Sequence, residues 1–118
     1  MDRRIEKIVA LIKADPGKEF RLDELSQFVN LSPSRVSHLF KRDTGMSVIS
    51  FVRAVRIRAA EELLKNSYLS IKEIRLKIGF TDESNFVRAF EKVHDTPPSR
   101  YRNSCHNTKS EVDSKINN

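Results

Sequence analysis

The chain has 118 residues, 22 lysines and arginines against 16 aspartates and glutamates, and a formal net charge of +6. This length suits one compact domain or two very small ones, and the basic balance favours a polyanionic partner, nucleic acid before an acidic membrane surface. The single cysteine excludes an internal disulfide and a thiolate zinc site, and no apolar run approaches the roughly 20 residues that span a bilayer. We therefore expect no membrane segment, no metal, no cofactor and a cytoplasmic location.

The first third of the chain predicts three helices. Apolar residues recur at three-and-four spacing from about residue 2 to 14, and Asp15-Pro16-Gly17 ends this helix because the residue before a proline is pushed out of the α region. A second helix, 22–29, ends at Asn30, which tolerates a left-handed conformation, and a third, 33–43, begins with a serine N-cap and a proline. This is a helix-turn-helix layout. The predicted core positions are Ile5, Ile8, Val9, Ile12, Leu25, Phe28, Val36, Leu39 and Phe40.

The middle of the chain, 47–65, predicts one long helix. At about 1.5 Å per residue, this helix is roughly 28 Å long, which is enough to act as a rigid spacer between two small units. Its apolar residues should form one buried stripe. They are Val48, Phe51, Val52, Val55, Ala59 and Leu63.

A second helix-turn-helix unit follows. Ser70 caps a helix to about Ile78, Gly79 makes a turn with φ > 0, and Asp82 caps a helix to about residue 94. A last short helical turn covers 99–102. The predicted core positions are Ile71, Ile74, Ile78, Phe80, Phe86, Phe90, Val93 and Tyr101.

Two stretches of the chain match at a fixed offset. Residues 40–47 align with residues 90–97, and Phe51 aligns with Tyr101. One supersecondary unit is therefore used twice, as a tandem of small helical modules. The predicted organisation is a first unit over 1–46, a linker helix over 47–65, a second unit over 66–103 and a disordered polar tail over 104–118.

The outer faces of the helices predicted over 33–43 and 82–94 carry hydrogen-bond donors suited to DNA. In 33–43 no acid precedes Asp43, and hydroxyl, imidazole and guanidinium groups can reach base edges while the later basic residues reach phosphates. An ordinary solvated face is the alternative for this helix alone. In the second copy, asparagine can pair with adenine, arginine with guanine, and valine can touch a thymine methyl. The carboxylates of Glu83 and Glu91 are repelled by phosphates, so we expect the second unit to bind DNA more weakly or more selectively.

Several separated motifs occur in order along the chain. They are LSPSRVSHLFK (31–41), RIRAAEELL (56–64), and IGFTDESNF (78–86) followed by FEK (90–92) and PPSRYR (97–102). With them, roughly residues 5–103 resemble the DNA-binding domain of the AraC/XylS family of bacterial transcription regulators. The resemblance implies an all-α fold of about seven helices, with two helix-turn-helix subdomains joined by a long central helix. It also implies sequence-specific binding of double-stranded DNA, with two recognition helices, about 33–43 and 82–94, in successive major-groove segments of an asymmetric site.

By position, the resemblance assigns two kinds of DNA contact. Base reading falls on Ser34, Arg35, Ser37, His38, Ser84, Asn85, Val87 and Arg88. Backbone contacts fall on Lys41, Arg42, Ser47 and Arg102. Three positions depart from the family pattern: Arg75 replaces a small residue, Asp95 a glycine and Glu91 a lysine. We expect Arg56 to pair internally instead of contacting DNA.

A second class of function stays open at this point. The chain could be a protein-interaction module that docks to RNA polymerase or to a partner regulator, with only weak DNA binding. An enzyme is not expected, because the sequence shows no nucleophile with its base and no phosphate-cradling glycine loop among three scattered glycines. The resemblance further implies RNA polymerase as a partner, and members often carry a separate ligand-binding or dimerisation domain that is absent from these 118 residues.

Overall fold

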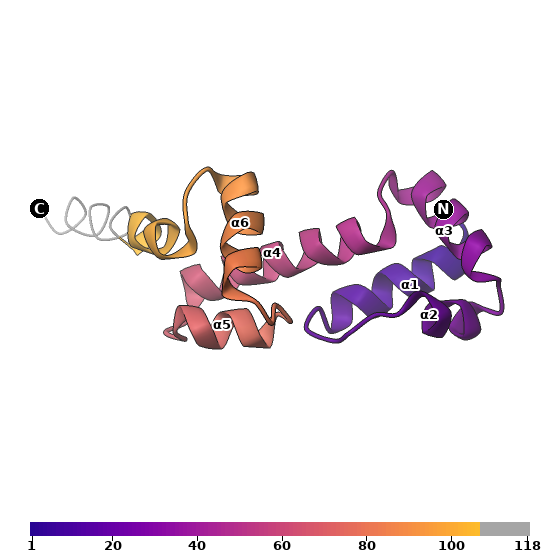
Figure 1. Ribbon diagram of the computed structural model, residues 1–118, viewed down its shortest axis with the longest axis horizontal. Helices are drawn as coiled ribbons and strands as arrows, with labels where there is room; N and C mark the ends of the chain where they lie inside the picture. Colours follow the sequence, from indigo (N-terminus) through magenta and orange to yellow (C-terminus); the bar gives the residue numbers. More distant parts are fainter. Residues whose placement is uncertain (107–118) are drawn as a thin grey trace, which may run out of the picture. The chain divides into compact units, whose positions relative to one another are not determined.

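The computed structural model describes residues 1–106, and all the regular secondary structure within them is helical (Figure 1). Six helices are α1 (Arg3–Ala14), α2 (Leu22–Val29), α3 (Pro33–Thr44), α4 (Val48–Asn66), α5 (Ile71–Lys77) and α6 (Glu83–His94). Residues 98–106 form a seventh helical segment. The predicted all-α fold of about seven helices is confirmed.

The chain divides into two compact units, the first ending at Arg56 and the second beginning at Ile57, so α4 contributes to both. Each unit has its own hydrophobic core. The first core consists of Ile5, Ile8, Ile12, Leu25, Val29, Val36, Leu39, Phe40 and Val52. The second consists of Ile57, Ala60, Leu64, Ile74, Ile78, Phe86 and Phe90.

The single apolar stripe predicted for α4 is wrong in its second half. Val52 is buried in the first core. Further along, Ile57 and Leu64 are buried in the second core, whereas Ala59 and Leu63 pack against it only partly buried. The physical reason is that α4 serves two separate cores. Which side chains of α4 are buried therefore depends on the core that each half of the helix packs against, and the buried residues do not form one continuous stripe.

The turns inside the two helix-turn-helix units are built alike. Asn30 and Gly79 both have positive φ, 56° and 91°, as predicted. The next residue in each turn donates its amide back to the preceding helix, Leu31 to the Ser26 carbonyl at 3.0 Å and Phe80 to the Arg75 carbonyl at 3.1 Å. These bonds satisfy carbonyls that a helix end otherwise leaves unpaired.

The repeat is also visible in the aromatic packing. The rings of Phe40 and Phe51 meet edge to face, with centroids 5.3 Å apart. Their counterparts 50 residues on, Phe90 and Tyr101, meet in the same way at 5.2 Å. Helices α3 and α6 are thus each held by an aromatic contact to the helix that follows. This contact fixes the orientation of their outer faces.

Two predicted core residues are exposed instead. Phe28 is 54% exposed and Val93 is 61% exposed. In α2 the buried side is shared by Leu25, Val29 and the small Ser26, which leaves Phe28 beside it. At the end of α6 the ring of His94 stacks on Phe90, with centroids 4.5 Å apart, and takes the place expected for Val93.

The last helical segment is longer than the predicted turn over 99–102. It runs through residue 106, three residues into the stretch expected to be a disordered tail. The remainder of that predicted tail, 107–118, lies outside the described residues.

The helix ends at Gly45 and Asp95 allow a direct test of local strain. Both residues adopt the left-handed conformation, with φ of 76° and 57°. Because a side chain is disfavoured there, although less for aspartate than for most residues, we expect Asp95→Gly to stabilise the chain by about 0.5 kcal/mol, or roughly 2–4 °C in Tm. Thermal unfolding measures this. The matched Gly45→Asp should lower Tm, and a fall in Tm for Asp95→Gly would contradict the strain argument.

Candidate nucleic-acid interface

The first candidate recognition helix, α3, packs against the core on one side and is exposed on the other. Ser32 caps it, since its hydroxyl accepts the Arg35 amide at 3.2 Å. Val36, Leu39 and Phe40 are buried. The four predicted base-reading side chains are all exposed. They are Ser34, Arg35, Ser37 and His38.

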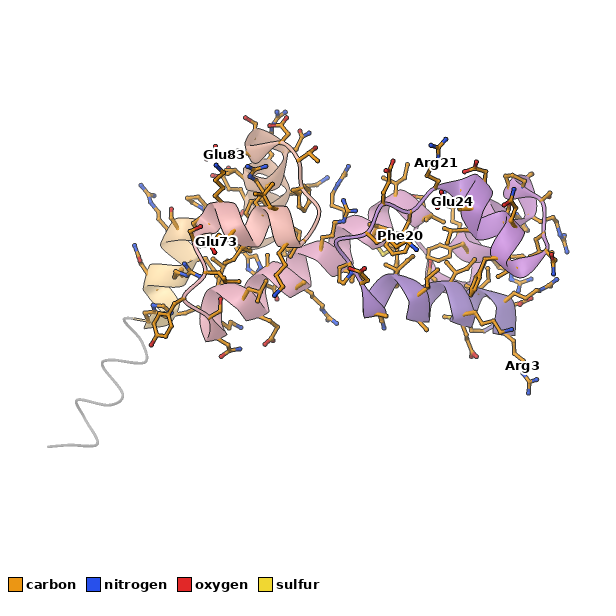
Figure 2. All side chains as sticks on the ribbon, turned by 90° about the horizontal axis from the view of Figure 1, so that it is seen from below. Arg3, Phe20, Arg21, Glu24, Glu73 and Glu83 are labelled. Atoms are coloured by element: carbon orange, nitrogen blue, oxygen red, sulfur yellow. The ribbon has the colours of Figure 1, made fainter. Side chains whose placement is uncertain are left out.

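The second candidate, α6, has the same construction with a different outer face. Asp82 caps it by accepting the Ser84 amide at 2.9 Å, and Phe86 and Phe90 are its buried anchors. Of the predicted base-reading residues, Ser84, Asn85 and Arg88 are exposed, whereas Val87 is half-buried. The exposed Glu83 lies at the start of this helix (Figure 2), so α6 carries an acid where α3 carries none.

Three of the four predicted backbone contacts, Lys41, Arg42 and Ser47, lie near the junction of α3 and α4. Lys41 is exposed on α3. Ser47 is exposed just before α4, and its hydroxyl accepts the Ser50 amide at 3.2 Å and donates to the Ser50 hydroxyl at 3.0 Å. Ser47 therefore caps α4, and the first amides of a helix suit a phosphate oxygen.

Arg42, the third predicted backbone contact, is already ion-paired. Its Nε donates to Asp43 Oδ1 at 2.9 Å. This bond raises the pKa of Arg42 and lowers the pKa of Asp43, so both groups are charged at neutral pH. Sequence reasoning missed Asp43, which looked like the last residue of a basic helix.

The fourth, Arg102, has an internal role. Its guanidinium donates to the carbonyl oxygens of Leu64 at 3.2 Å, Leu63 at 3.4 Å and Ser67 at 3.4 Å. These carbonyls belong to the end of α4 and the residue after it, where a positive charge is favourable. A phosphate contact from Arg102 stays a prediction that has to compete with these bonds.

Substitution separates the two roles of Arg102. We expect Arg102→Ala to lower the free energy of unfolding by about 1–2 kcal/mol, because partly buried carbonyls lose a charged donor, and to leave the salt dependence of DNA binding unchanged. Lys41→Ala is the control, since loss of a phosphate contact should reduce the slope of log Kd against log salt by about 0.9. If the salt slope of Arg102→Ala fell as much as that of Lys41→Ala, Arg102 would be a phosphate contact, as the resemblance implies.

Two other arginines stabilise loops. Arg56 donates from Nε to the Pro16 carbonyl at 2.8 Å and from Nη2 to the Lys18 carbonyl at 3.0 Å, which confirms its expected internal role. Burial lowers the pKa of Arg56. Arg75, which sequence reasoning treated as a packing problem, donates from Nη1 to the carbonyls of Phe80 at 3.0 Å and Thr81 at 2.8 Å. Arg75 thus braces the turn that leads into α6.

Over residues 1–106, no three His, Cys, Asp or Glu side chains are grouped so that they could hold a metal ion. In the same part of the chain, no helix has both the length and the apolar character needed to cross a membrane.

The helix pairs α2–α3 and α5–α6, in each of which the second helix is N-capped and exposes its outer face, define a helix-turn-helix protein. The sequence model of a family described as "Helix-turn-helix domain" matches residues 25–104. The chain belongs to this family, within the AraC/XylS type of regulators.

Named relatives agree with this family. The arabinose operon regulatory protein of Escherichia coli (strain K12) is 34% identical over 98% of this chain and 40% of its own length. The protein of the same name from Salmonella typhimurium (strain LT2) is 38% identical over 89% of this chain and 38% of its own length. The chain therefore spans about two fifths of the length of these relatives.

Two solved structures share the fold. The C-terminal domain of AraT, a response regulator from Geobacillus stearothermophilus, is 27% identical with a TM-score of 0.80, covering 87% of this chain and 86% of that chain. The DNA-binding domain of the global transcriptional factor AdpA, solved in complex with a target DNA, is 20% identical with a TM-score of 0.82, covering 87% and 93%.

Proposed function

We propose that the chain is the DNA-binding part of a bacterial transcription regulator and reads a specific duplex sequence with α3 and α6. One observation carries the proposal. Each unit has an N-capped helix fixed by buried aromatic anchors on one side, with exposed hydrogen-bond donors on the other. The net charge of +6 and the DNA complex of the AdpA domain, which has the same fold, support it.

The two helices offer different chemistry to bases. On α3, Arg35 suits the O6 and N7 acceptors of guanine, and Ser34, Ser37 and His38 add shorter donors. On α6, Asn85 suits adenine, Arg88 suits guanine, and the half-exposed Val87 suits a thymine methyl. Because the two faces differ, a single chain reads an asymmetric site with two dissimilar boxes and not a palindrome.

Backbone contacts set the position on the duplex. We assign these to Lys41, Arg42 and the capped start of α4 at Ser47. Such contacts carry no base information, but they release counterions and make affinity fall with salt. We further propose that the two helices enter successive major-groove segments, which are about 34 Å apart on one side of B-DNA.

The proposal includes the setting of the whole regulator. The chain spans about two fifths of the regulators it resembles, so we place a ligand-binding or dimerisation domain in the remainder of such a protein. RNA polymerase is the proposed protein partner, and the bacterial cytoplasm the proposed location.

Selection from a randomised duplex pool with the purified chain tests the proposal. Two short, dissimilar boxes about one helical turn apart among the retained sequences are the expected result. One box would limit base reading to a single unit. The absence of any enrichment, with binding lost at moderate salt, would refute sequence reading by this chain and favour an interaction module.

A further inference from the structure

We propose that Asp43 is a positioning residue for DNA binding, which holds the Arg42 guanidinium in place so that its outer edge meets a backbone phosphate. The inference rests on the proposed DNA-binding function and adds a residue to it. Asp43 itself would not touch DNA.

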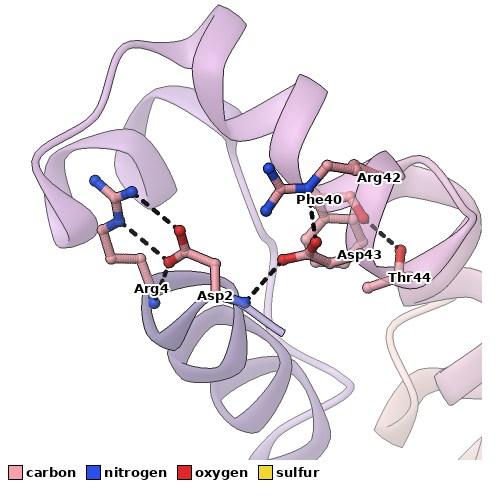
Figure 3. Close-up of polar contacts among 6 residues, drawn as sticks. All are labelled: Asp2, Arg4, Phe40, Arg42, Asp43 and Thr44. Carbon is pink, nitrogen blue, oxygen red and sulfur yellow. Dashed lines mark hydrogen bonds and ion pairs between the residues drawn. The ribbon is translucent and has the colours of Figure 1, made fainter.

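The geometry around Asp43 leaves its carboxylate fully engaged (Figure 3). Its Oδ1 accepts from Arg42 Nε at 2.9 Å, and its Oδ2 accepts from the backbone amide of Asp2 at 2.9 Å. The Asp43 side chain is 9% exposed, whereas that of Arg42 is 56% exposed. One end of the ion pair is therefore fixed in the protein and the other end faces solvent.

The amide that holds Asp43 is itself fixed. Asp2 caps α1, because its side chain accepts the Arg4 amide at 2.8 Å, and it also accepts from Arg4 Nη2 at 3.0 Å. The hydrogen bond from the Arg4 side chain is the main reason that the pKa of Asp2 falls to about 2. On the other side of Asp43, the Thr44 hydroxyl donates to the Phe40 carbonyl at 2.7 Å. Asp43, in the last turn of α3, is thus held in place by the start of α1.

The position of Arg42 on α3 suits a phosphate. Arg35, His38 and Arg42 follow one another at three-and-four spacing, so they lie along one side of the helix. The Arg42 guanidinium donates to Asp43 through Nε. Its two Nη groups make no hydrogen bond to the other residues drawn in Figure 3. A guanidinium presents its donors in a rigid fork, so a bond at Nε orients the Nη groups for an anion.

The second unit lacks this arrangement. At the offset of 50 residues, Arg42 corresponds to Lys92 and Asp43 to the exposed Val93. A lysine has no separate edge to share between a carboxylate and a phosphate. The first unit is therefore the one with a preorganised backbone contact.

Asp43→Asn distinguishes positioning from simple charge by the sign of its effect. Removing a carboxylate near a polyanion should tighten binding if only charge matters. If Asp43 orients Arg42, the substitution should weaken binding to every duplex by about three- to tenfold, because a long side chain must then be ordered on binding. Glu91→Gln is the matched control, since it removes an exposed carboxylate from α6 and should tighten binding.

A double-mutant cycle of Asp43→Asn and Arg42→Ala completes the test, with Kd measured across a salt series and unfolding followed in parallel. Arg42→Ala should weaken binding and reduce the salt slope by about 0.9. In the Arg42→Ala background, the effect of Asp43→Asn should vanish. A merely structural role of Asp43 would instead give the same loss in both backgrounds.

The outcomes separate the inference from the proposed function. Tighter or unchanged binding by Asp43→Asn, or a loss that persists without Arg42, overturns the inference and leaves the proposed function standing. Failure of the unsubstituted chain to select any duplex overturns the function itself. Should Asp43→Asn not fold, Arg42→Lys tests the same arrangement, because it keeps the charge and loses the fork. Wild-type affinity for Arg42→Lys would also overturn the inference.

Discussion

Phe90→Ala is expected to unfold the second unit while the first stays folded. Phe90 is fully buried, and its ring lies between those of Phe86, His94 and Tyr101, with centroid distances of 6.2, 4.5 and 5.2 Å. Truncating a buried phenylalanine costs about 3–5 kcal/mol. A unit of this size has a total stability of the same order. The first unit has its own core, so it should keep its structure.

Hydrogen exchange resolved along the chain measures this outcome. The amides of α5 and α6 should lose protection, while those of α1 to α3 keep it. Val93→Ala, on the same helix but 61% exposed, is the control and should change stability by no more than about 0.5 kcal/mol. Loss of protection throughout the chain would mean that the two cores fold as one cooperative unit.

The same variant has a consequence for binding. With α6 unfolded, the chain should still select the box read by α3, through Arg35 and its neighbours. A complete loss of selection would show that α3 cannot read DNA without the second unit.

Local features of this fold could be predicted from the sequence because their causes are local. Ser70 caps α5 in a full capping box with Glu73, as a serine three residues before a glutamate indicates. The turn at Asn30 and Gly79 needs φ > 0, which asparagine and glycine adopt most easily. The exposure of Arg35 and Arg88 follows from the helical spacing of the apolar residues beside them.

Features that depend on contacts distant in sequence could not be predicted in this way. Asp43 meets the amide of Asp2, 41 residues away, and Arg102 meets the carbonyl of Leu64, 38 residues away. Phe28 matches the apolar spacing of α2 as well as Leu25 does, but it is exposed, because the buried side of this helix is made by Leu25, Ser26 and Val29. Periodicity gives the faces of a helix, and only tertiary packing decides how much of each face is covered.

Arg88→Ala is expected to relax discrimination at one base position of the duplex and to leave the others unchanged. Arg88 is exposed on α6, one turn after Asn85, and Phe86 and Phe90 hold the helix from behind. If Arg88 donates two hydrogen bonds to a guanine, its loss should cost about 1–3 kcal/mol on the preferred sequence. On a duplex that already lacks this guanine, the loss should be small.

Binding of both proteins to the selected duplex and to all its single-base variants measures the effect. Lys72→Ala, which removes an exposed cation from α5, is the control for charge and should lower all affinities slightly and equally. An equal loss on every sequence for Arg88→Ala would refute base reading and assign Arg88 to the backbone. Because α3 packs in the first core and α6 in the second, Arg88→Ala should not change base discrimination in the box read by α3. The losses of binding free energy caused by Arg35→Ala and Arg88→Ala should therefore add.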